Sequence, residues 1–188
     1  MSTAMPVLVT PRVTVRPFGL ADLEFCHQLL DHEAWQTGRS LDERRSWLEW
    51  TVGNYAALAQ LYQPPYGDRA LVLRATGELI GSVGLVPALG PFDRLPSFAG
   101  QPAIDYFTPE FGLFWAVRPA QRGQGYAAEA ARAMIDFMFA EFRLRRIVAQ
   151  TEADNLASQG VMRRLGMRLE RNPRPEPAWF QVVGVLER

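Results

Sequence analysis

The chain has 188 residues, of which 48% are hydrophobic and 21% are charged. This composition is typical of a folded globular protein of one domain, and it excludes a disordered tail or a fibrous repeat. Twenty basic residues balance twenty acidic ones, so the chain lacks the excess of positive charge that nucleic-acid binding requires.

No segment approaches 18 consecutive apolar residues, and the first ten residues do not combine a basic stretch with an apolar core. We therefore expect neither a transmembrane helix nor a secretory signal. The single cysteine, Cys26, cannot form an internal disulfide, which is typical of the reducing cytoplasm. We expect a cytoplasmic protein without a membrane partner, in which residues 1–188 form one domain with a core of about residues 10–187 and a flexible start at residues 1–9.

The first elements combine one strand with two helices. Residues 12–18 alternate between apolar and polar side chains, which predicts a strand, and the leucines of residues 20–30 predict a short helix. Ser40 and Glu43 match the S-x-x-E capping box, which predicts the start of a second helix that ends near Leu61.

A hairpin and a buried strand are predicted in the middle of the chain. Residues 69–75 and 78–86 flank a Thr-Gly turn and have the composition of paired strands. Residues 87–102 are rich in proline and have no period, which predicts a long loop of the kind that is usually functional. Residues 111–117 are apolar throughout, which is typical of a strand buried on both faces.

The C-terminal third alternates between helices and strands. The expected elements are a helix at 125–142, a strand at 147–151, a helix at 155–165, and strands at 167–171 and 179–186. Helices inserted between strands throughout the chain predict an α/β layer structure with a mixed sheet.

The turn between the buried strand and the helix at 125–142 has the features of an anion site. Gly123 and Gly125 allow backbone amides to approach a ligand without a Cβ in the way. The helix start supplies unpaired donors and the positive end of the helix dipole, and Arg122 adds a full charge. Phosphate or pyrophosphate is the expected ligand, and a glycine-capped turn without a ligand is the alternative.

Residues 123–128 formally match the dinucleotide pattern G-x-G-x-x-G/A. That pattern requires the strand to run directly into the first glycine, whereas residues 118–122 intervene here. Only 60 residues follow Ala128, which is too few for the second half of a doubly wound sheet. A dinucleotide site is therefore a weak interpretation of the turn.

A second family pattern covers much more of the chain. Residues 122–127 (RGQGYA) resemble the R/Q-x-x-G-x-G/A signature of the Gcn5-related N-acetyltransferases (GNAT), whose loop binds the pyrophosphate of acetyl-coenzyme A. Residues 110–115 (EFGLFW) are similar to the E-x-G-x-x-[WV] strand of that family. Residues 151–166 resemble the N-x-x-S…LG helix of its RimJ/RimL-like branch, and residues 12–17 also fit. The resemblance runs from about residue 12 to residue 186.

The resemblance implies a single-domain GNAT-like fold: a mostly antiparallel sheet of six to seven strands, splayed in the middle and flanked by about four helices. It implies transfer of an acetyl group from acetyl-CoA to a primary amine by direct attack. The acceptor would be a protein or peptide N-terminal amine or a small-molecule amine, and the protein a monomer or homodimer. An acyl-CoA-binding sensor without turnover and a dinucleotide-binding oxidoreductase are the alternatives.

The resemblance also assigns site residues. Glu110 is the expected general base, because an amine is protonated at neutral pH and must lose a proton before it attacks; a solvated glutamate at a strand end is the alternative. Ser158 would stabilise the departing thiolate by a hydrogen bond, and Asn155 would contact pantetheine or merely cap a helix. The expected cofactor-binding set is Trp115, Ala116, Val117, Arg122, Gly123, Gln124, Gly125, Tyr126, Ala127, Asn155 and Ser158.

Cys26, His27 and His32 are close in sequence and contain metal-ligating atoms. Three residues without a fourth ligand are a weak zinc pattern, so we expect no metal. Acceptor specificity is expected in the helices between Trp35 and Tyr66 and in the loop at residues 87–102.

Overall fold

The computed structural model of the protein describes residues 6–98 and 106–188. Within them, eight strands are hydrogen-bonded in the order β1-β2-β3-β4-β5-β6-β8-β7. Their pairing includes parallel and antiparallel neighbours, which confirms the predicted mixed α/β class. The strands are β1 (Leu8–Val9), β2 (Val13–Pro17), β3 (Gly67–Leu73), β4 (Leu79–Gly90), β5 (Thr108–Val117), β6 (Arg146–Thr151), β7 (Arg168–Arg171) and β8 (Val182–Glu187). The α-helices are α1 (Leu23–His27), α2 (Leu41–Gln60), α3 (Tyr126–Glu141) and α4 (Leu156–Arg164).

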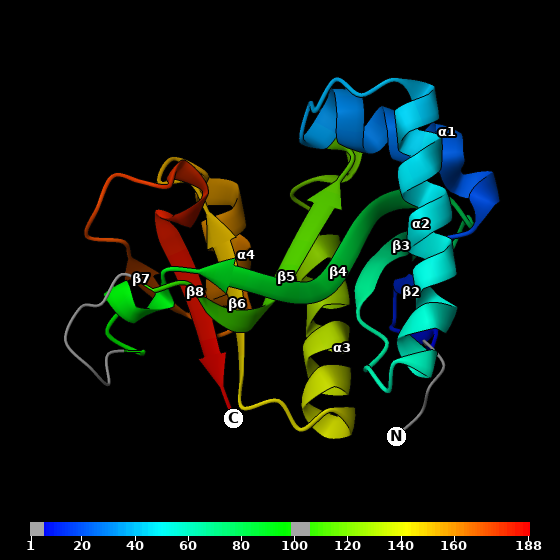
Figure 1. The fold of residues 1–188 in the computed structure, drawn as a ribbon. Helices are drawn as coiled ribbons and strands as arrows, with labels where there is room; N and C mark the ends of the chain where they lie inside the picture. Colours follow the sequence, from blue (N-terminus) through cyan, green and yellow to red (C-terminus); the bar gives the residue numbers. More distant parts are fainter. Residues whose placement is uncertain (1–5, 99–105) are drawn as a thin grey trace. The chain divides into compact units, whose positions relative to one another are not determined.

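The chain divides into two compact units, whose helices and strands are labelled in Figure 1. The first contains Met1–Gly84 and Trp115–Phe142, and the second contains Leu85–Phe114 and Arg143–Arg188. Strands β4 and β5 each pass from one unit into the other along the chain. None of the helices in the described residues combines the length and hydropathy needed to span a bilayer.

In the first unit, β2 pairs antiparallel with both β1 and β3. Ala70 of β3 packs into a buried cluster with Leu23 and Cys26 of α1 and Leu48 of α2. This buried cluster fixes α1 and α2 against the strands. Helix α3 contacts β1 and β2 of the same unit.

The two N-terminal helices follow the sequence prediction in one case and depart from it in the other. The Ser40–Glu43 capping box is confirmed: Glu43 N donates to Ser40 Oγ at 3.3 Å, and Ser40 N donates to Glu43 Oε2 at 2.8 Å. Residues 20–30, expected to form one short helix, instead form a 3₁₀ turn (Leu20–Asp22), α1 and the start of a π-helical segment, η2 (Gln28–Ala34).

In the second unit, β8 pairs antiparallel with both β6 and β7. Phe92 and Leu95 pack with Phe180, Val148 and Val183 into a buried cluster. This unit therefore has a core of its own, to which β6 and β8 contribute side chains. Helix α4 contacts β6, β7 and β8.

Several elements differ from the sequence prediction in their extent, and one short strand is additional. Strand β4 continues to Gly90, so the start of the loop predicted at residues 87–102 is strand, and residues 99–102 lie outside the described residues. Leu8–Val9, expected to be flexible, pairs with β2 as an additional short strand. The last strand begins only after a 3₁₀ turn at Ala178–Phe180. The short strand accounts for part of the difference between the eight strands found and the six to seven predicted.

Candidate active site

The glycine turn of the first unit joins β5 to α3. After Val117, a 3₁₀ turn (Pro119–Gln121) leads to Gly123 and Gly125, whose φ angles are 76° and 87°. Both lie in the left-handed region, which residues with a Cβ rarely occupy. Gly125 is the N-cap of α3 and offers no capping side chain. The first turn of the helix is therefore left open to an external acceptor.

The backbone amides of this turn are unpaired within the part of the chain that the structure describes. Within the described residues, none of the amides from Gly123 to Ala128 donates to a protein acceptor, and the first helical bond runs from Glu129 N to Gly125 O at 3.0 Å. A set of unpaired amides at the positive end of a 16-residue helix is suited to bind an anion.

Arg122 does not point freely toward this turn. Its Nε donates to Val117 O at 2.9 Å, and its Nη2 donates to Glu33 O at 3.2 Å. Glu33 belongs to η2 and also pairs with Arg118 at 3.2 Å. Two donors of Arg122 thus hold the turn against β5 and η2, and sequence reasoning, which assigned its charge to the ligand, missed this use.

The start of α3 is anchored to the segment before β2. Arg12 Nη1 donates to Gln124 O at 3.0 Å, Arg12 Nε pairs with Glu129 Oε2 at 2.7 Å, and the guanidinium lies 4.8 Å from the centre of the Tyr126 ring. Thr10 Oγ1 also donates to Glu129, at 2.6 Å. Burial raises the pKa of Glu129, but these hydrogen bonds outweigh it and hold the pKa below its usual range. Tyr126 therefore has a packing role here, and the Arg12–Glu129 anchor was not found from the sequence.

The end of β5 that precedes the turn is buried and closely approached. Ala116 packs against Leu29 and Leu30 of the N-terminal helices. A Cβ on Gly81 of β4 would lie 2.3 Å from Ala116 O, so no other residue fits there without moving backbone. This close approach explains why a glycine occupies this position of β4.

In the second unit, the parallel pairing of β5 with β6 is minimal. Gly112 is opposite Val148, and no further described residue of β5 in this unit is paired with β6. In general, two strands that pair over a short length can admit an extended ligand between them in the manner of an added strand.

Glu110 lies beside an arginine but is not hydrogen-bonded to it. Its Oε1 is 3.5 Å from Arg146 Nε, and that nitrogen is buried without a hydrogen-bond partner. Arg146 Nη1 is 3.7 Å from Glu187. Burial raises the pKa of Glu110 above its usual value, although Arg146 and Arg145 oppose the rise. A carboxylate with a raised pKa and no hydrogen bonds of its own has the properties of a general base.

Asn155 and Ser158 lie together at the start of α4. Asn155 is the N-cap, and its Oδ1 accepts a hydrogen bond from Ser158 N at 3.0 Å. The capping interpretation of Asn155 is thus confirmed. Both side chains are half-buried. The Ser158 amide uses one of the two lone pairs of Asn155 Oδ1, so the cap does not exclude a further contact of this side chain with a ligand.

Comparison with known proteins identifies the family. The profile described as "Acetyltransferase (GNAT) domain" matches residues 12–168. The FsC-acetyl coenzyme A-N(2)-transacetylase of Aspergillus fumigatus is 29% identical over 168 residues, which cover 87% of this chain and 66% of that protein. A 41% match to the uncharacterized N-acetyltransferase YnaD of Bacillus subtilis spans only 32% of this chain and 35% of that relative. The chain belongs to the GNAT family.

Solved GNAT structures have the same fold. An acetyltransferase from Agrobacterium tumefaciens superposes with a TM-score of 0.68 at 25% identity, over 100% of this chain and 98% of that one. RimL, a ribosomal L7/L12 alpha-N-protein acetyltransferase solved with coenzyme A, superposes with a TM-score of 0.64 at 19% identity, over 97% of each chain. The family match makes the protein an acyl-CoA-dependent N-acetyltransferase, and the RimL structure shares its fold. The same match favours the GNAT family over the dinucleotide interpretation of the turn.

The site residues expected from the GNAT motifs are divided between the two units. The first unit contains the strand end at residues 115–117 and the turn at residues 122–127, and the second contains Glu110, Asn155 and Ser158. Cys26 lies in a core cluster of the first unit. Among the described residues, no group of three His, Cys, Asp or Glu side chains is arranged to hold a metal ion.

Proposed function

We propose that this GNAT protein transfers an acetyl group from acetyl-CoA to a primary amine, and that the turn at residues 122–127 binds the diphosphate of the donor. The observation that carries the proposal is that the amides from Gly123 to Ala128, at the start of α3, donate to no acceptor among residues 6–98 and 106–188. Diphosphate oxygens are the acceptors that such a run of donors favours.

For the remaining residues we propose the roles that the resemblance to the GNAT motifs implies. Glu110 removes a proton from the acceptor ammonium, directly or through a water, so that the nitrogen lone pair can attack the thioester carbonyl carbon. A backbone amide in residues 115–117 stabilises the negative charge that develops on the carbonyl oxygen. The C–S bond then breaks, and Ser158 donates a hydrogen bond to the departing thiolate, which takes up a proton. Asn155 contacts the pantetheine arm.

The direct route agrees with the state of the single cysteine. Burial raises the pKa of the Cys26 thiol to about 12, and its side chain is fully buried. A thiol in this state is not a nucleophile at neutral pH. We therefore propose attack by the amine itself, without an acetylated cysteine as an intermediate.

The names of two similar proteins indicate the class of amine that accepts the acetyl group. The Aspergillus relative is named for N(2)-transacetylation, and RimL for acetylation of an alpha-amine of a ribosomal protein. Both names support a primary amine on a small molecule or at a polypeptide N-terminus.

Ligand-induced stabilisation tests the proposed binding turn. At 100 times its dissociation constant, coenzyme A should stabilise the protein by about 2.7 kcal/mol, a rise in Tm of roughly 5–10 °C, whereas NAD should have no effect. Gly125→Asp places a carboxylate among the amides and should abolish the shift. Gly53→Asp adds the same charge to an open position on α2 and should retain it. A full coenzyme A shift in Gly125→Asp would show that the turn is not the binding site.

Turnover separates a transferase from a sensor. Release of free thiol from acetyl-CoA should depend on an added amine when small amines and N-terminal peptides are supplied in turn. Coenzyme A binding without amine-dependent thiol release from any member of the panel would favour the sensor.

A further inference from the structure

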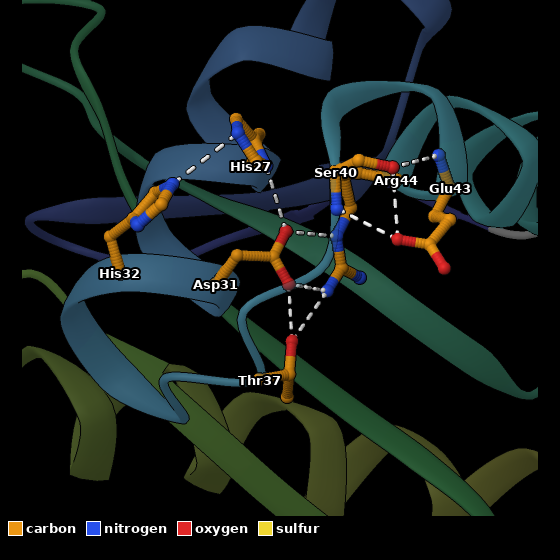
Figure 2. Close-up of polar contacts among 7 residues, drawn as sticks. All are labelled: His27, Asp31, His32, Thr37, Ser40, Glu43 and Arg44. Carbon is orange, nitrogen blue, oxygen red and sulfur yellow. Dashed lines mark hydrogen bonds and ion pairs between the residues drawn. The ribbon is translucent and has the colours of Figure 1, made fainter.

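His27 and His32 form a close pair at the junction of α1 and η2 (Figure 2). Their Nε2 atoms are 3.3 Å apart, and the two rings meet edge to face. Residues five apart lie about 140° apart around a regular α-helix and would not meet. The wider π-helical turns of η2, which begins directly after His27, bring the two side chains to one side.

A buried ion pair fixes the orientation of the His27 ring. Asp31 Oδ2 lies 3.0 Å from His27 Nδ1, and Arg44 contacts both oxygens of the same carboxylate, at 2.8 and 2.6 Å. Thr37 donates a further hydrogen bond to Asp31. Because an ionised carboxylate only accepts hydrogen bonds, Nδ1 of His27 must carry the proton. The lone pair of His27 is therefore on Nε2, the atom that faces His32.

The separation of the two nitrogens matches that of ligands on one metal ion. Two imidazole nitrogens bound at about 2.0–2.1 Å to a tetrahedral ion lie roughly 3.3–3.4 Å apart. The Asp31–His27 contact is the carboxylate–histidine arrangement that usually orients a metal-bound imidazole. His32 is exposed, so its ring can change tautomer and present Nε2 at little cost.

We propose that His27 and His32 bind one divalent transition-metal ion through their Nε2 atoms, with Asp31 and Arg44 holding the His27 ring in position. No third His, Cys, Asp or Glu among the described residues completes the set, so water would fill the remaining coordination positions. Imidazole ligands suit Cu²⁺, Ni²⁺ and Zn²⁺, and the expected order of affinity places Cu²⁺ first. This site is independent of the acetyl-transfer proposal.

The chain is well suited to a direct test because it contains only two histidines. Tag-free protein should be titrated with Cu²⁺, Ni²⁺ and Zn²⁺ by calorimetry, and the Cu²⁺ complex should be examined by electron paramagnetic resonance. We expect one ion per chain and hyperfine coupling to imidazole nitrogens. His27→Ala and His32→Ala should each lower the affinity at least tenfold.

Cys26→Ala is the matched control, because the thiol is the strongest competing ligand nearby in sequence, and it should leave the affinity unchanged. Unfolding curves of each variant without metal establish that the fold is kept. His32→Ala is the variant least expected to disturb the fold, because His32 is exposed. Wild-type affinity no higher than that of the His27→Ala/His32→Ala double variant would overturn the proposal, as would loss of binding in Cys26→Ala.

Discussion

Asp31 and Glu110 both lie beside an arginine, but the pKa values of their carboxyl groups are shifted in opposite directions. Asp31, in the first unit, is 2% exposed and accepts hydrogen bonds from Arg44 Nη2 at 2.6 Å and from Arg44 Nε at 2.8 Å. Burial raises the pKa of its carboxyl, but hydrogen bonds from Arg44, Thr37 and His27 outweigh it and hold the pKa well below its usual range. Glu110, in the second unit, has its pKa raised by burial despite Arg146.

The difference lies in hydrogen bonding rather than in the presence of an arginine. Arg146 Nε is 3.5 Å from Glu110 and makes no hydrogen bond to it, and no other described residue donates one to that carboxylate. Charge attraction alone does not compensate for desolvation, whereas direct hydrogen bonds do. Asp31 is thus a structural carboxylate, and Glu110 is left in the condition that a proton acceptor needs.

The largest expected effect is on catalysis at Glu110. Glu110→Gln should lower kcat by roughly 10²–10⁴-fold, because the amide cannot accept the proton of the acceptor amine. Affinity for coenzyme A, measured by calorimetry, should not change. Glu187→Gln removes another carboxylate beside Arg146 and should retain near-normal kcat. Equal activity of the two variants would remove Glu110 from the catalytic role.

The next effect is on stability at Asp31. Asp31→Asn leaves the buried Arg44 without its counter-charge and should lower the free energy of unfolding by about 3–5 kcal/mol, measured in urea. Glu49→Gln on the exposed side of α2 should change it by less than about 0.5 kcal/mol.

The pH dependence of stability sharpens this prediction. The folded pKa of Asp31 is lowered, so its contribution is fully present above the ordinary aspartate range and is lost as the pH falls toward the folded value. The Asn variant should lack this acid-dependent loss. An unfolding free energy of Asp31→Asn that falls in acid as steeply as that of the wild type would contradict the structural role.

The smallest effect is a displacement of the activity profile. Because burial raises the pKa of Glu110 and only the ionised form accepts a proton, kcat/KM should fall in acid through a pKa above the ordinary glutamate value. Arg146 lowers this pKa, so Arg146→Gln should move the acid limb to higher pH. Arg168→Gln removes an arginine that pairs with Glu170 and Glu187 instead and should leave the limb in place. If kcat/KM of Arg146→Gln fell in acid at the same pH as that of the wild type, a group other than Glu110 would control the acid limb.

Local signals in the sequence predicted the parts of the fold that local interactions determine. The capping box at Ser40, the N-cap at Asn155 and the left-handed glycines before α3 each depend on backbone groups a few residues away. Their side-chain or backbone requirements can therefore be recognised from residue type and spacing.

Contacts between distant segments could not be predicted in this way. Arg12 and Glu129 are 117 residues apart, and Arg122 is fixed by the carbonyl of Glu33, 89 residues earlier. The π-helical turn that brings His27 to His32 has no distinctive residue pattern. A single sequence shows which residues are charged, but the partner of each charge is decided by tertiary packing.

The proposed binding of the acetyl-CoA diphosphate depends on the amides of residues 123–128, which nuclear magnetic resonance observes directly. Coenzyme A should be titrated into ¹⁵N-labelled protein while the amide signals of Gly123, Gly125 and Tyr126 are followed. We expect large downfield shifts of the proton signals of these amides, because each amide gains a charged hydrogen-bond acceptor. Saturation by coenzyme A without a change in these signals would contradict the proposed binding.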